Sequence, residues 1–136
     1  MVDEEKVEKR LLKLEEAVRK LKEIAQFPEE EYHQNEGLRD RTERNLHIAA
    51  QACIDIANHI IADKGYRTPQ GYADSFEVLM EEGIIPSDLA AKMKMIAGFR
   101  NILVHDYQEI DDKIVYSCLT NLQDFKQFAE YVYRLL

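Results

Sequence analysis

The sequence has few of the residues that interrupt helices. Only 5 glycines and 3 prolines occur in 136 residues, and no strand-like alternation is sustained. Aliphatic and charged side chains are plentiful instead, at 46% hydrophobic and 32% charged residues. This composition is typical of an α-helical bundle and argues against a β-rich fold. The length fits one domain, residues 1–136, which buries roughly two-thirds of its unfolded surface.

Long apolar runs and abundant cysteine are also missing. No run approaches the ~20 apolar residues of a membrane span, and charge begins at Asp3, which argues against a signal peptide. Cys53 and Cys118 lie in apolar helical surroundings, where we expect small core residues rather than a disulfide. We therefore expect a cytoplasmic protein with no membrane partner.

Positive charge is scarce in the chain as a whole. The formal net charge is −8, which counts against indiscriminate nucleic-acid binding, because phosphate contacts need clustered lysines and arginines. Much of the acid lies in the first third of the chain. Between positions 87 and 105 the only acid is Asp88, against Lys92, Lys94 and Arg100. This segment is locally basic although the protein is not.

Apolar periodicity at spacings of three and four predicts five helices. Residues 29–37, after Phe27-Pro28, are predicted to form a loop that can enter the next helix early. The predicted helices span 3–25, 38–64, 73–82, 86–105 and 111–136.

The helix over 86–105 carries two apolar arcs rather than one. The first arc contains Leu89, Met93, Ile96 and Val104, and the second contains Ala91, Met95, Phe99 and Ile102. Two arcs indicate packing both inside the subunit and against a second copy, and Gly98 permits a close approach. We therefore expect a homodimer formed through this helix.

A polar stripe follows the helix over 38–64, which is otherwise apolar nearly all round. It contains Arg44, His47, Gln51, Asp55, Asn58 and His59. The stripe either faces solvent or lines a cleft. Asp55 and His59 would fit half of a metal site, but no further ligand occurs at a suitable spacing, so no metal is expected.

The stretch from Arg100 to Tyr107 reads Arg-Asn-Ile-Leu-Val-His-Asp-Tyr and carries polar groups into apolar surroundings. Burying a guanidinium costs several kcal/mol unless it is paired or faces a cavity. A helix that only filled a core would not need one. This octapeptide is our candidate active site.

Arg-x4-His-x-Tyr, at Arg100, His105 and Tyr107, resembles the signature of HepT-like toxins, which are HEPN-superfamily ribonucleases. Residues 43–61 resemble the long second helix of the same family. The likeness covers nearly the whole chain. It implies an all-α, up-and-down HEPN bundle of four to five helices that dimerises through the motif-bearing helices. It also implies an endoribonuclease toxin whose partner is a minimal nucleotidyltransferase (MNT-type) antitoxin.

Ribonuclease chemistry without a metal or other cofactor needs a base, an acid and positive charge at the phosphate. His105 suits either proton role, since an unperturbed histidine titrates near pH ~6.5. Arg100 offers a planar fork for phosphate oxygens, and Asn101 can orient the imidazole or donate to phosphate. Arg100 and His105 lie ~140° apart on an ideal helix, which favours a cleft shared by two subunits.

By resemblance, Tyr107 is the residue to which the antitoxin transfers AMP; the alternative is a packing tyrosine. Added bulk and charge beside the histidine would repel RNA. Further residues are candidates for contacts with RNA in the cleft. They are Arg44, Gln51, Asp55, His59, Lys94 and Arg67, the last in a Pro/Gly-punctuated loop where it can equally be an ordinary surface arginine.

A second function class remains open at the level of the sequence. The chain can be a catalytically inactive helical partner that helps a nucleotidyltransferase to recognise its substrate. Such a protein would keep both apolar arcs but would not require Arg100 or His105. A purely structural helical dimer is a third reading, against which the arginine in an apolar run argues.

Overall fold

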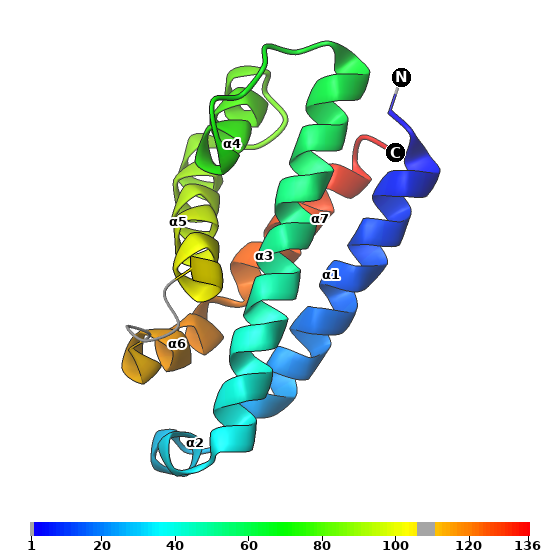
Figure 1. Ribbon diagram of the computed structural model, residues 1–136. Coiled ribbons are helices and arrows are strands. Elements are labelled where there is room, and N and C mark those ends of the chain that lie inside the picture. Colours follow the sequence, from blue (N-terminus) through cyan, green and yellow to red (C-terminus); the bar gives the residue numbers. More distant parts are fainter. Residues whose placement is uncertain (1, 106–110) are drawn as a thin grey trace.

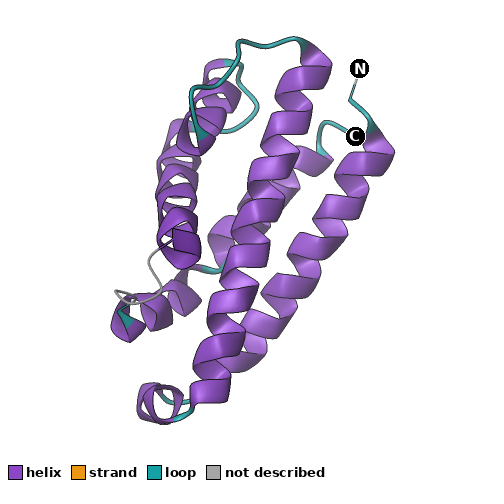
Figure 2. Ribbon diagram, viewed as in Figure 1, coloured by secondary structure: helices purple, strands orange, loops and turns teal. Residues whose placement is uncertain are grey.

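The structure is built from helices around one long central helix (Figure 1). This computed structural model describes residues 2–105 and 111–136, and the side chains of residues 104 and 105 lie outside the description. No strand occurs among the described residues (Figure 2). The elements are α1 Glu4–Ile24, α2 Glu29–Gln34, α3 Glu36–Lys64, α4 Tyr72–Glu81, α5 Ser87–His105, α6 Asp112–Cys118, the 3₁₀ helix η1 Leu119–Asn121, and α7 Gln123–Tyr133.

Helix α3 lies at the centre of the bundle, with α1 packed along one side and α5 along another (Figure 1). Helix α4 packs on α5 and α3, and α7 contacts α1, α3 and α5. The buried side of α3 is mostly small or aliphatic, which lets its neighbours approach from several directions. Its buried apolar residues are Leu38, Leu46, Ala49, Ala50, Ala52, Cys53, Ile54, Ile56, Ala57, Ile60 and Ile61.

Several predicted features are confirmed. Helix α1 buries the expected apolar face, and α3 stops before Gly65, whose φ of 68° is the left-handed angle that favours glycine at a helix end. Helix α5 runs to His105 as expected. Both cysteines are free thiols, Cys53 fully buried and Cys118 partly so.

The expected loop after Pro28 is instead the short helix α2. Tyr32 in this helix is fully buried, and its ring lies 5.0 Å from that of Tyr116. The next helix also begins earlier than predicted, because the Asn35 side chain accepts a hydrogen bond from Leu38 N at 3.1 Å and caps α3 at Glu36. Tertiary packing of one aromatic side chain thus outweighs the polar composition of this segment.

The prediction of one continuous last helix over 111–136 is wrong. It is interrupted by η1, where side-chain hydroxyls bond back to the main chain. Ser117 Oγ donates to Ile114 O at 2.6 Å, and Thr120 Oγ1 donates to Ser117 O at 2.7 Å. Such bonds compete with the regular ladder and bend helices. The bend separates α6 from α7.

Candidate active site

Arg100 is held by side chains from three helices. Its Nε donates to Gln51 Oε1 on α3 at 2.8 Å, and its Nη1 donates to Asn101 Oδ1 on α5 at 3.1 Å. The Tyr72 ring, at the start of α4, lies 5.1 Å from the guanidinium carbon, a cation–π contact. The guanidinium is therefore fixed where α3, α4 and α5 meet.

The hydrogen bond from Arg100 continues across α3 to α1. Gln51 Nε2 donates to Asp55 Oδ1 at 2.9 Å, and Asp55 Oδ2 lies 3.7 Å from Arg10 Nε. Because the amide nitrogen faces Asp55, the amide oxygen is left to accept from Arg100. We call this chain of contacts the Arg100–Gln51–Asp55–Arg10 relay. It fixes the Gln51 side chain at both ends.

The charge of Arg100 is not neutralised by any carboxylate within ion-pair distance in the described part of the chain. Its guanidinium has five N–H donors, of which the contacts to Gln51 and Asn101 use two. Among the described residues, three donors are left for an anion. This arrangement suits a phosphate, which planar guanidinium groups bind bidentately.

Two other candidate cations are engaged by acids. Arg67 donates to Asp74 at 2.8 Å and to Glu81 at 2.8 Å, and its hydrogen bonds to Asp74 lower the pKa of that carboxyl to about 2. Lys94 forms an ion pair with Glu77. A phosphate would have to break these contacts, so we do not include Arg67 or Lys94 in the proposed site.

Only some residues of the polar stripe of α3 contribute to the Arg100 site. Gln51 and Asp55 belong to the relay, whereas Arg44 is exposed and makes no ion pair with any described residue. His59 is half-buried, and its side chain makes no hydrogen bond within the described ranges. Half-buried His47 has its pKa lowered by burial and by the charges of Arg100 and Arg44. The field around His47 is therefore positive.

His105 is the last residue of α5, and its side chain lies outside the described residues, as does the whole of Tyr107. The helix nevertheless places the His105 backbone at its carboxyl end. Asn101, one turn earlier, is exposed. Its Oδ1 is taken by Arg100, which leaves its Nδ2 hydrogens to donate to a substrate or to the imidazole.

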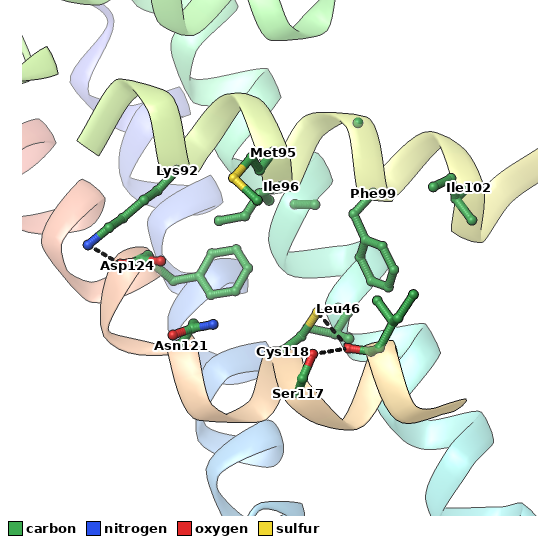
Figure 3. A pocket seen from close by; sticks show the side chains of 14 residues that line it. Leu46, Lys92, Met95, Ile96, Phe99, Ile102, Ser117, Cys118, Asn121 and Asp124 are labelled. Atoms are coloured by element: carbon green, nitrogen blue, oxygen red, sulfur yellow. Dashed lines mark hydrogen bonds and ion pairs between the residues drawn. The ribbon is translucent and has the colours of Figure 1, made fainter. Parts of the chain in front are cut away.

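An apolar groove of about 630 Å³ runs beside the other face of α5 (Figure 3). Met95, Phe99 and Ile102 line it from α5, facing Ile114 and Cys118 of α6. Met95 is 76% exposed, Ile102 43% and Ile114 53%, which is unusual for side chains so apolar. The second predicted arc of α5 is thus uncovered, whereas Leu89 and Met93 of the first arc are buried.

Comparison with known proteins identifies the family. A family model described as ribonuclease HepT-like matches residues 14–132, which is most of the chain. The chain belongs to this ribonuclease HepT-like family. The family and the class of activity predicted from the Arg-x4-His-x-Tyr motif are thereby confirmed.

Individual HepT-like relatives agree with this assignment. The mRNA nuclease HepT of Shewanella oneidensis is 39% identical over 103 residues, which cover 75% of this chain and 77% of that protein. The tRNA nuclease HepT of Aphanizomenon flos-aquae is 35% identical over 82 residues, or 58% of this chain and 54% of that protein.

A solved structure shows the same fold. It contains the tri-AMPylated HEPN toxin of Shewanella oneidensis in complex with MNT antitoxin. That toxin is 31% identical and superposes with a TM-score of 0.87, covering 94% of this chain and 96% of that chain. The all-α HEPN fold expected from the sequence is confirmed.

Sequence reasoning missed two contacts of this HepT-like site. Tyr72 lies in the loop-to-helix junction, where its place beside Arg100 depends on the packing of α4. Arg10 lies in a run of mixed charges on α1, and only its pairing with Asp55 distinguishes it. No helix in the described part of the chain is long and apolar enough to cross a membrane. In the same part of the chain, no three His, Cys, Asp or Glu residues gather as metal ligands.

The lowered pKa of His47 predicts a pH-dependent contribution to stability. The folded protein binds this proton less readily than the unfolded chain, whose histidine titrates near pH ~6.5. The contribution is therefore fully present above that pH and is lost as the pH falls through the lower, folded pKa. His47→Gln should reduce the loss of unfolding free energy between about pH 7 and 5. The free energy of unfolding of both proteins is measured with urea across this pH range. If it changes with pH by the same amount in both, the assignment is contradicted.

Proposed function

We propose that this chain is a metal-independent endoribonuclease toxin that acts in the cytoplasm as a homodimer and is neutralised by an MNT-type antitoxin through AMP transfer to Tyr107. The observation that carries the catalytic part is the uncompensated, immobilised charge of Arg100 one turn from the end of α5. The family and the toxin–antitoxin context of its solved relative support the same reading. The two free cysteines suit a reducing compartment.

In the proposed reaction, free N–H groups of Arg100 bind the non-bridging oxygens of the scissile phosphate and stabilise the charge that develops on them. His105 transfers the proton that leaves the ribose 2′-OH or the one that joins the departing 5′-oxygen. The Asn101 amide donates to phosphate or holds the imidazole. In a cleft shared by two subunits, one His105 takes the 2′-OH proton and the other protonates the departing 5′-oxygen, while Arg100 supplies the positive charge.

Arg100 is effective because a neutral amide, rather than a carboxylate, holds it. The Gln51 oxygen fixes the guanidinium without cancelling its charge, and the Asp55 charge behind it is met by Arg10. A carboxylate at the Gln51 position would compete with RNA phosphate for the same donors. The relay thus supplies orientation while leaving the field at the substrate positive.

A homodimer across the apolar groove would complete the site. On α5 the exposed arc of Met95 and Ile102 lies beside the stripe that carries Asn101 and His105. A second copy packed on this arc brings two such stripes together, so that each subunit's Arg100 lies near a cleft that contains both histidines. Exposed Gly98 in the groove permits close contact of the two helices.

The catalytic proposal is tested with His105→Ala. Loss of a general acid or base should lower RNA cleavage by roughly 10²- to 10⁴-fold and abolish growth arrest, with helicity and mass in solution unchanged. The control is His33→Ala, which removes a histidine on α2 that contacts Glu29 and should leave cleavage intact. Equal cleavage by the wild type and by His105→Ala would favour the alternative of a catalytically inactive partner of the nucleotidyltransferase.

The dimer is tested by placing charge in the groove. Met95→Glu combined with Ile102→Glu should give a folded monomer without ribonuclease activity, because unpaired carboxylates would be buried in the interface. Leu12→Glu is the matched control, since Leu12 is 64% exposed on α1 away from the groove, and it should remain dimeric and active. Sedimentation gives the oligomeric state of each variant, and an RNA cleavage assay on the same samples gives its activity. A folded monomer that cleaves RNA normally would disprove the shared cleft.

Neutralisation is tested with Tyr107→Phe. This variant should retain cleavage, because the proposed proton transfers do not use the phenol. It should also resist the antitoxin, because it lacks the oxygen that accepts AMP. Mass spectrometry after co-expression with the nucleotidyltransferase should show the adduct on wild type and on the control Tyr133→Phe, but not on Tyr107→Phe. An adduct at another residue that still restores growth would refute the assignment.

A further inference from the structure

A second groove, of about 330 Å³, lies between α1 and α3 on the far side of Gln51 from Arg100. Lys9, Arg10 and Lys13 line it from α1, and His47, Gln51 and Asp55 line it from α3. Gln51 therefore belongs to both places. Its oxygen accepts from Arg100 at 2.8 Å, while its amide nitrogen faces Asp55 in the groove at 2.9 Å. The groove and the Arg100 contact are therefore adjacent, with Gln51 between them.

This groove is positively charged in a protein whose net charge is −8. It has three cations against one carboxylate, and that carboxylate, Asp55, is already paired with Arg10 at 3.7 Å. Lys13 makes no ion pair with any described residue. Lys9 lies 3.6 Å from Glu5, but the two side chains are 73% and 81% exposed, so water and salt weaken this pair.

The acid that follows Lys13 by one turn does not cancel its charge. Glu16 is bound by Arg19 through two hydrogen bonds of 2.6 and 3.0 Å. Farther along the stripe of α3, exposed Arg44 adds another cation without an ion pair among the described residues. These cations thus form a positive band that runs from Arg100, past His47, to Lys9 and Lys13 in the groove.

We propose that the α1–α3 groove binds a backbone phosphate of the RNA next to the scissile one, with Lys9 and Lys13 as its principal contacts. This inference rests on the proposed ribonuclease function. A single strand held at Arg100 must leave the site along some surface, and this band is positively charged and adjoins it. Contacts of this kind carry no base preference and position the strand. They also explain how an acidic protein can hold RNA at one place only.

The test compares two double variants that remove the same charge from α1 and its surroundings. The first is Lys9→Ala with Lys13→Ala. The control is Lys22→Ala with Lys126→Ala, whose side chains line a different groove, between α1 and α7. Binding of a labelled single-stranded RNA is measured against salt concentration in full-length protein that also carries His105→Ala, so that the RNA stays intact.

The expected result is a smaller salt dependence for the first pair only. Each lost phosphate contact on a single strand reduces the slope of log K against log salt by about 0.7, so loss of the one phosphate proposed for this groove predicts a decrease of about 0.7. Without His105→Ala, the first pair should raise KM for RNA and leave kcat near wild type. The control pair should change neither the slope nor KM beyond the effect of net charge.

Three outcomes would overturn this inference. If both pairs have the same slope and the same KM while wild type cleaves RNA, the groove is not a phosphate site, and the ribonuclease function still stands. If the Lys9 and Lys13 changes weaken binding of the nucleotidyltransferase but not of RNA, the groove is a protein-docking surface. A wild-type protein that neither binds nor cleaves RNA would instead reject the proposed function together with this site.

Discussion

The hydrogen bond from Arg100 to the Gln51 amide is the contact on which the site depends. Hydrogen bonds to charged groups contribute about 1.5–3 kcal/mol, and leaving such a group without a partner in a partly buried position costs a similar amount. The Arg100 guanidinium avoids this cost because it contacts the neutral Gln51 oxygen, the Asn101 amide and the face of the Tyr72 ring. None of these cancels the charge, so the guanidinium is both ordered and available.

The bundle makes this arrangement possible through the position of α3. Because α3 is apolar on several sides, it can pack against α1 and α5 at once, and its polar stripe lies between them. The stripe joins the two neighbours through the relay from Arg100 to Arg10. Helix α5 in turn has one apolar arc buried against α3 and one exposed in the groove. The packing inside the subunit and the surface that we propose for a second copy thus lie on opposite sides of one helix.

Much of the fold was predictable because long amphipathic helices have periodic sequences and glycine marks their ends. The missed elements are short and owe their form to particular contacts. Helix α2 depends on the burial of Tyr32, and η1 on hydroxyls that bond to the main chain at Ser117 and Thr120. Propensity and period carry no signal for such contacts.

The site was predictable where a residue type was out of place in its surroundings, as Arg100 is in an apolar helix. It was not predictable where function depends on which acids lie nearby. Arg67 and Arg100 are equally cationic in the sequence, yet Asp74 and Glu81 engage the first, whereas Gln51 holds the second. Those pairings join residues 7 to 49 positions apart, so only the folded chain distinguishes them.

The neutrality of the Gln51 side chain also has a genetic consequence. Glutamine and glutamate codons differ at a single base, and the two side chains have nearly the same shape. Gln51→Glu would put a carboxylate where the amide oxygen now accepts from Arg100 at 2.8 Å. The protein itself would then neutralise the guanidinium charge that we propose to bind RNA phosphate. The second carboxylate oxygen would face Asp55, which would lose the amide donor that it now has at 2.9 Å. A cell burdened by this nuclease is thus one point mutation away from a silent version of it.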